Sequence, residues 1–157
     1  MVHPFVMITL TFLLLAHCEA RVPTGCVMIR SNYNNKYLAM AGKHSTNRRN
    51  TRTHANPTLW FIELEGDHYL IREHKTPNEL YAGTYTYDAD RRHVLVWTQG
   101  NRIVEAMWEI ERLENGAFLI RSKHLQEHMY AADYPSSDKV FTWRIKDANV
   151  RGNIKFH

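Results

Sequence analysis

β-Branched and aromatic residues recur with a period of two in three similar segments of the chain. These segments read Val-Met-Ile-Arg at 27–30, Tyr-Leu-Ile-Arg at 69–72 and Phe-Leu-Ile-Arg at 118–121. In each segment the isoleucine is followed nine positions later by an apolar residue (29 to 38, 71 to 80 and 120 to 129). Alternation of β-branched and aromatic residues predicts strands. The same strand pattern therefore occurs three times.

Each of the three units also ends in a Trp-x-Ile triplet. The triplets are 60–62, 108–110 and 143–145. Turn-forming residues follow the first two triplets, Glu-Gly-Asp at 65–67 and Glu-Asn-Gly at 114–116. These turns are short enough to join the end of one unit to the first strand of the next by a hairpin.

A strand-rich unit used three times predicts an all-β protein, and we expect a β-trefoil of three internal repeats. A propeller normally needs at least four blades, so three copies do not close one. In a trefoil, six strands close a short barrel and three hairpins cap one end of it. The repeats are placed at about 26–66, 67–115 and 116–157, and a two-sheet sandwich is the alternative.

The third repeat is predicted to be shortened. The distance from the second strand to the closing tryptophan is 20 residues in the first unit (40 to 60) and 26 in the second (82 to 108), but 12 in the third (131 to 143). We therefore expect a short third cap hairpin, and merging of its last two strands is one way to shorten it. The alternating tail 153–156 is predicted to pair with the N-terminal strand.

The N-terminal segment 1–20 is predicted to be a signal peptide. An apolar run at 6–16 is too short to span a bilayer, and small residues at Cys18 and Ala20 are spaced as a cleavage site requires. A retained N-terminal apolar helix is the alternative. The remaining chain, 21–157, is then one secreted, extracellular domain, and no second segment is apolar enough for a membrane span.

Cleavage after Ala20 would leave Cys26 as a single cysteine in an oxidising compartment. By alternation it should point outward, which favours an exposed thiol or an intermolecular disulfide that links a homodimer; a buried, inert thiol is the alternative. No metal site, cofactor motif or nucleophile–base arrangement is recognisable, so no enzyme is expected. Export and the absence of a recognition motif disfavour nucleic-acid binding.

Basic side chains in the hairpin loops of the first two repeats are the best functional candidates, on a chain with a net charge of +4. The candidate anionic-ligand face comprises Lys43, His44, Arg48, Arg49, Arg52, Arg91, Arg92 and His93. Because trefoil hairpins gather at one end of the barrel, the two clusters should merge into one positive face. Such a face attracts sulfated or phosphorylated polyanions; loops that only maintain solubility are the alternative.

The repeated arginines Arg30, Arg72 and Arg121 directly follow the isoleucine that should face the barrel interior. They should therefore point outward. We expect them to form ion pairs or to stack on the outer surface rather than to bind a ligand.

Along residues 26–157 the chain resembles the β-trefoil superfamily. The motifs Leu-Tyr-Ala at 80–82, Asp-Arg-Arg at 90–92, Val-Leu-Val-Trp at 94–97 and Trp-Glu-Ile at 108–110 are most similar to the trefoil domain of insect low-molecular-mass haemolymph lipoproteins. Ricin-B-like lectins and heparin-binding growth factors are further relatives. The Gln-x-Trp motif of the ricin type is missing, because Thr58, Ala106 and Phe141 occupy the glutamine positions.

The resemblance implies a secreted binding module that recognises carbohydrate or a sulfated or otherwise anionic glycan through its basic hairpin loops. The alternative is a haemolymph-type storage or carrier protein without catalytic activity.

Overall fold

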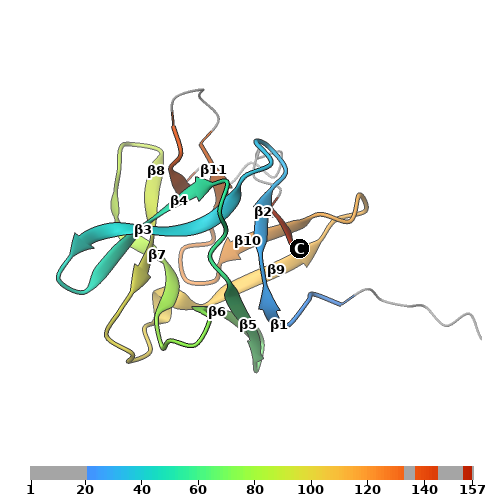
Figure 1. Cartoon of the computed structure of the whole chain (residues 1–157), viewed down its shortest axis with the longest axis horizontal. Coiled ribbons are helices and arrows are strands. Elements are labelled where there is room, and N and C mark those ends of the chain that lie inside the picture. The colour runs from blue at the N-terminus through green and yellow to red at the C-terminus, as the bar shows by residue number, and fades with distance from the viewer. Residues whose placement is uncertain (1–20, 133–136, 145–153, 157) are drawn as a thin grey trace, which may run out of the picture.

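The computed structural model describes residues 21–132, 137–144 and 154–156, and the predicted signal peptide lies outside them. The chain folds almost entirely into β-strands (Figure 1). The strands are β1 (Gly25–Val27), β2 (Ile29–Ser31), β3 (Tyr37–Ser45), β4 (Arg48–His54), β5 (Trp60–Glu65), β6 (His68–Glu73), β7 (Glu79–Thr86), β8 (Arg91–Trp97), β9 (Trp108–Arg112), β10 (Phe118–Ser122), β11 (His128–Ala131), β12 (Val140–Trp143) and β13 (Ile154–Phe156). A short 3-10 helix, η1, covers Val104–Ala106.

The first and last strands of each repeat close a barrel. Strand β1 pairs with β5, β5 with β6, β6 with β9, β9 with β10, β10 with β13, and β13 with β2, which continues β1 after Met28. The pairing is equivalent in the three repeats, since Val27 lies opposite Trp60, Tyr69 opposite Trp108, and Phe118 opposite Ile154. The predicted β-trefoil is confirmed.

The repeated apolar positions fill the barrel. Ile29, Ile71 and Ile120 have no exposed surface, and neither do Trp60 and Trp108. A buried indole N–H must find an acceptor. It donates to the carbonyl oxygen of the second strand in the same repeat, from Trp60 to Leu38 at 3.0 Å and from Trp108 to Leu80 at 2.9 Å. The two tryptophans thus join the barrel to the base of the cap.

The cap consists of three hairpins, β3–β4, β7–β8 and β11–β12. The second strands of these hairpins, β4, β8 and β12, are the third strands of the repeats. They meet one another, because β8 pairs with both β4 and β12. An isolated bridge between Arg52 and Lys139 joins β4 to the segment that leads into β12. Each repeat therefore contributes one strand to a closed triangle at the end of the barrel.

The third repeat differs from the prediction in one respect. Its hairpin is short, with 4 residues in each of β11 and β12, as expected. The assignment of 143–145 as its closing strand is wrong: Trp143 ends β12, which pairs with β8 and β11 as a third strand does. The closing strand is β13, so the last two strands are not merged, and the predicted pairing of the tail with the N-terminal strand is confirmed.

Two of the three repeated arginines form ion pairs on the outer surface, as predicted. Arg72 pairs with Glu63, and Arg121 donates its Nε–H to Glu109 at 2.7 Å. Arg30 lies opposite Lys155 instead of an acid. The outward orientation predicted for Cys26 is also confirmed, since the free thiol is exposed. Across the described residues no helix is long and apolar enough to cross a membrane.

Candidate functional site

A cavity of about 360 Å³ opens where the third strands of the three hairpins meet. Its polar lining comes from all three repeats: Asn50 and Arg52 in β4, His93 in β8, and Asp138 and Lys139 before β12. We call this cavity the cap pocket. The three strands that bound it are held by backbone pairing, so its walls belong to the rigid part of the fold.

Two further contacts fix the pocket walls. The buried Thr51 hydroxyl donates to the Val94 carbonyl at 2.6 Å and holds β4 against β8. The Thr53 N–H donates to the Asp138 carbonyl at 2.5 Å and holds the segment before β12 against β4. The bond from Thr53 uses the backbone carbonyl of Asp138, so the exposed side chain of Asp138 stays available to the solvent.

An exposed aromatic ring stands next to the cap pocket. Tyr87 is 40% exposed, and its ring packs edge-on against His93 at 5.2 Å between centroids. The Lys139 ammonium lies 4.3 Å from the centre of the Tyr87 ring and 3.2 Å from its hydroxyl. The Arg91 guanidinium lies 5.1 Å from the same ring. Tyr87 thus presents a ring with cations around it, an arrangement that cation–π attraction stabilises.

His93 is the histidine in the lining of the cap pocket. Burial lowers its pKa, and the nearby positive charges of His44 and Lys139 lower it further. The His44 and His93 rings lie 5.6 Å apart, and His44 is held by Asn50 at 3.0 Å. His93 is therefore neutral at pH 7, where its ring can both donate and accept a hydrogen bond.

A second cavity, of about 430 Å³, lies at the far end of the β3–β4 hairpin. Its basic residues are Lys43, Arg48 and Arg49, and its other lining residues are Ser45, Thr46, Asn78 and Thr98. We call this cavity the hairpin pocket. Strand β4 contributes to both pockets, since residues 48–49 line the hairpin pocket and residues 50–52 line the cap pocket.

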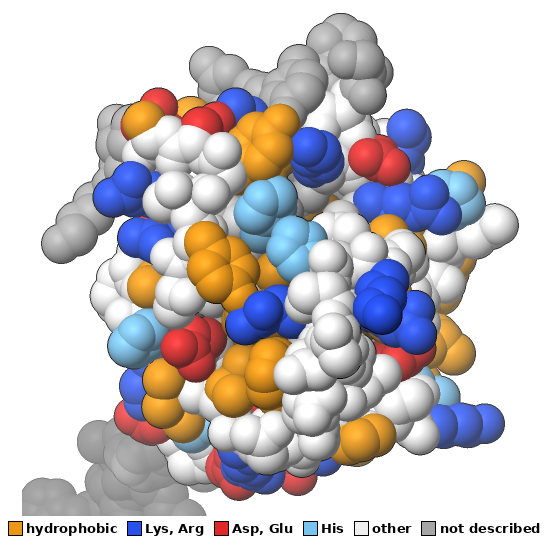
Figure 2. Space-filling view, turned by 90° about the vertical axis from the view of Figure 1, so that its left-hand side faces the viewer, with side chains coloured by type: hydrophobic (Ala, Val, Ile, Leu, Met, Phe, Trp, Pro, Cys, Tyr) orange, Lys and Arg blue, Asp and Glu red, His pale blue; other side chains and the backbone are white. Residues whose placement is uncertain are grey.

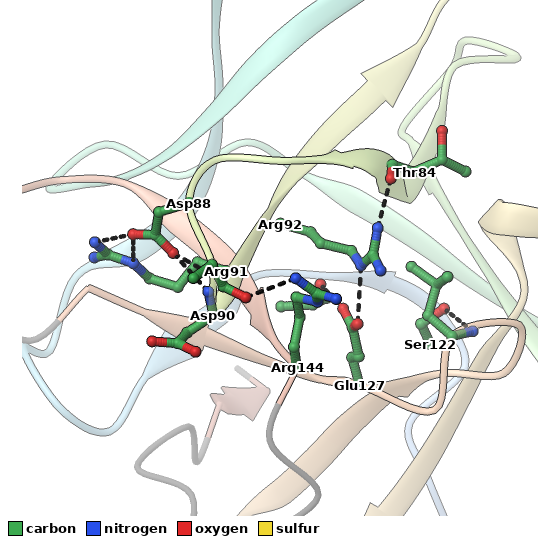
Figure 3. A network of polar contacts seen from close by, with 11 residues as sticks. Thr84, Asp88, Asp90, Arg91, Arg92, Ser122, Glu127 and Arg144 are labelled. Atoms are coloured by element: carbon green, nitrogen blue, oxygen red, sulfur yellow. Dashed lines mark hydrogen bonds and ion pairs between the residues drawn. The ribbon is translucent and has the colours of Figure 1, made fainter.

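Arg91 and Arg92 are engaged within the fold (Figure 3). Arg92 points toward the third repeat, where its Nε–H donates to Glu127 at 2.9 Å, and it also donates to the Thr84 carbonyl at 2.5 Å. Arg91 turns the other way and donates its Nε–H to Asp88 at 2.6 Å. Only 18% of the Arg92 side chain is exposed. Both charges are therefore compensated by neighbouring acids.

The structure thus divides the predicted anionic-ligand face. His44, Arg52 and His93 gather at the cap pocket, and the remaining first-repeat cations gather at the hairpin pocket. One face of the molecule carries basic, histidine and hydrophobic side chains close together (Figure 2). Sequence reasoning missed Tyr87, Asp138 and Lys139. The trefoil geometry already implied Asp138 and Lys139, because the third hairpin must reach the same end of the barrel as the other two.

No group of three or more metal-ligating side chains that could hold an ion occurs in the described part of the chain. The polar groups of both pockets are hydrogen-bond donors and acceptors on a rigid scaffold. Such an arrangement is suited to binding a polar, negatively charged molecule.

The chain matches no model of a known protein family and no curated protein sequence. It is similar to a solved salivary protein of Culex quinquefasciatus from the Cysteine and Tryptophan-Rich family, with 26% identity and a TM-score of 0.77 over 87% of this chain and 95% of that one. A Polyporus squamosus lectin bound to the epitope Neu5Acα2-6Galβ1-4GlcNAc shares 20% identity, with a TM-score of 0.67 over 87% of this chain and 49% of that one.

A ricin B-like lectin of Macrolepiota procera in complex with lactose shares 12% identity, with a TM-score of 0.64 over 87% of this chain and 97% of that one. These likenesses agree with the β-trefoil found here. The particular resemblance to insect haemolymph lipoproteins, and with it the storage or carrier role, stays a prediction.

Proposed function

We propose that this protein is a secreted, non-enzymatic module that binds a negatively charged glycan at the cap pocket. The observation that carries the proposal is the position of Tyr87, an exposed ring with Lys139 and His93 in contact with it at the edge of a cavity. Carbohydrate sites combine an apolar ring surface with a few well-placed polar groups.

The chemistry of the pocket suits a charged sugar. The C–H face of a pyranose ring can pack on Tyr87, which is large, exposed and rigid. Asp138 offers a carboxylate for sugar hydroxyls, and Lys139 and Arg52 offer positive charge for an acidic substituent. Asp138 also repels anions, so the pocket should prefer a sugar with both hydroxyls and a single acidic group.

The similar structures support the kind of ligand. The Polyporus lectin was solved with a glycan that ends in Neu5Ac, a carboxylate-bearing sugar, and the Macrolepiota lectin with lactose. The Culex relative is a salivary protein, which supports secretion of this chain.

The test is a glycan array followed by calorimetric titration of the best ligand at fixed salt concentration. Tyr87→Ala and Lys139→Gln should each weaken binding about tenfold, which corresponds to ~1.4 kcal/mol. Tyr33→Ala and Lys36→Gln are matched controls, because Tyr33 is 53% exposed and Lys36 is an exposed lysine, and neither lines the cap pocket. Equal loss in the control variants, or binding that survives both pocket substitutions, would overturn the proposal.

A further inference from the structure

We infer that the hairpin pocket is a separate subsite for a tetrahedral oxyanion carried as an ester on the glycan, a sulfate or phosphate group. The inference rests on the proposed function for the sugar part of the ligand. It adds a second recognition element, which selects among anionic glycans by the kind of acidic group they carry.

The hairpin pocket carries positive charge that no acid in its lining balances. Lys43, Arg48 and Arg49 line one cavity, and among the described residues none of them forms an ion pair. Elsewhere the fold supplies acids to its arginines, such as Glu63 to Arg72 and Glu109 to Arg121. The lining of the hairpin pocket contains no acid. Three neighbouring positive charges repel one another, so a bound anion would remove an unfavourable interaction that the fold leaves in place.

The hairpin pocket also offers hydroxyl donors beside its cations. Around the three cations the pocket offers the hydroxyls of Ser45, Thr46 and Thr98. A sulfate or phosphate ester has three terminal oxygens in a tetrahedral arrangement, and it can accept bonds from several directions at once. A carboxylate has two oxygens in one plane and would leave part of this donor set unused. The cap pocket contains Asp138 and is the less suitable of the two for a dianion.

The hairpin tip and the Arg48 side chain are held in place before any ligand binds. The tip of the β3–β4 hairpin is bound to the segment after β8, because the Thr98 N–H donates to the Asn47 carbonyl at 3.0 Å and Gln99 donates to the Asn47 side chain at 2.9 Å. The Arg48 guanidinium is held between two rings, 5.1 Å from the centroid of Tyr85 and 5.5 Å from that of Trp97. The Arg48 guanidinium therefore loses little conformational freedom when an anion binds.

The hairpin pocket and the cap pocket are both lined by residues of β4. Residues 48–49 line the hairpin pocket and residues 50–52 line the cap pocket, and one residue of a strand advances the chain by about 3.3 Å. Tyr87 packs on His93, and Arg49 lies opposite Val96, three residues further along β8, so an oligosaccharide that spans about 10 Å can place a sugar ring on Tyr87 and an ester group in the hairpin pocket. The sugar ring and the ester group are then recognised by different parts of the cap.

The test compares the wild-type protein with a hairpin-pocket variant, Lys43→Gln with Arg49→Gln. The control is Lys36→Gln with Arg112→Gln, which removes the same charge from exposed residues outside both pockets. Arg48 is left intact because its contacts with Trp97 contribute to packing. Binding is measured for a sulfated oligosaccharide, its desulfated form, a phosphorylated sugar and inorganic sulfate, all at matched ionic strength.

The wild-type protein should bind the ester-bearing glycan at least about tenfold more tightly than the desulfated form, and the pocket variant should lose this difference. The slope of log affinity against log salt concentration should also fall in the pocket variant and not in the control. The preference between the sulfated and the phosphorylated ligand identifies the source of the oxyanion.

Equal affinity of the wild-type protein for the sulfated and desulfated glycans would overturn the inference and leave the proposed function standing. Equal loss in the pocket and control variants would also overturn it, because net charge would then explain the effect. Binding of inorganic sulfate that depends on Lys43 and Arg49, without binding of any glycan, would support the oxyanion subsite and refute the proposed function.

Discussion

Arg92 and Glu127 form an ion pair between two repeats, with Nε and Oε1 2.9 Å apart although 35 residues of chain separate them. Glu127 also accepts a hydrogen bond from the buried Thr142 hydroxyl at 2.8 Å, and only 8% of its side chain is exposed. The carboxylate therefore joins β8 of the second repeat to the hairpin of the third. It takes the place of the longer strand contacts that the short third hairpin lacks.

Removal of this carboxylate should destabilise the protein. Glu127→Ala leaves Arg92 and Thr142 without their partner in a largely buried place, and we expect the free energy of unfolding to fall by about 3 kcal/mol. Urea denaturation measures the change. The exposed pair of Arg102 and Glu65 is the control, because Glu65→Ala should cost less than about 1 kcal/mol. Similar losses in the two variants would contradict the structural role of Glu127.

Stability should decrease as the pH falls below the ordinary histidine pKa of 6.5. Burial lowers the pKa of His93, and burial also lowers that of His128, so the unfolded chain takes up protons at these sites before the folded one does. The stability contributed by the neutral histidines is complete above pH 6.5 and is lost as the pH falls through their lowered values. Unfolding in urea at pH 7.5 and 5.5 measures the difference.

His93→Gln should reduce this pH dependence, and His128→Gln should reduce it independently. The exposed His124 serves as the control, since its replacement should leave the difference between the two pH values unchanged. A wild-type protein that is equally stable at both pH values would contradict the effect.

The indole of Trp108 should contribute more to stability than its size alone suggests. Trp108→Phe removes the hydrogen bond to the Leu80 carbonyl and leaves that buried acceptor unpaired beside a cavity. We expect a loss of about 2–4 kcal/mol in the free energy of unfolding, measured in guanidinium chloride. Trp97→Phe is the matched control, because the Trp97 indole is partly exposed and bonds the Asn101 side chain. Equal losses in the free energy of unfolding for the two substitutions would show that the hydrogen bond from Trp108 to the Leu80 carbonyl adds nothing to stability.

Cys26 should react with iodoacetamide in the folded protein, since the thiol is free and exposed. In an oxidising buffer we expect a species of twice the mass on a non-reducing gel, absent when reductant is added and absent in Cys26→Ser. The substitution should leave the unfolding curve unchanged, because the Cys26 side chain is exposed. A monomer under all conditions would refute the Cys26-linked homodimer.

The fold was predictable because its barrel is built from a repeated pattern of apolar residues. Ile29, Ile71 and Ile120 occupy the same place in each repeat, and each follows a β-branched or aromatic residue two positions earlier, a pattern that the sequence shows directly. The third closing strand was misplaced for a physical reason. Tryptophan ends the third strand of the second and third repeats, at Trp97 and Trp143, and the latter happens to be followed two residues later by an isoleucine.

The spacing between strands indicates the correct closing strand of the third repeat. Ile154 follows Ala131 by 23 residues, a distance between the 20 and 26 residues found in the other repeats. The division of the basic residues was not predictable in this way. A sequence shows that Arg92 is positive but not that Glu127, in another repeat, neutralises it. Tyr87 and Lys139 likewise become neighbours only when the hairpins of two repeats meet.

The pairing of β13 with β2 closes the barrel with the last strand of the chain. The first barrel strand therefore pairs with a strand far along the sequence, since Ile154 lies opposite Ser31. Contacts of such large sequence separation slow the search for the native state, and an incompletely synthesised chain exposes strand edges that can associate with other chains. A circularly permuted chain that begins at the turn between β5 and β6 would convert this last pairing into a local hairpin. The permuted chain would then close its barrel through β5 and β6, its new terminal strands, whose register of six pairs is longer than the three of β13 and β2, so it should fold no faster.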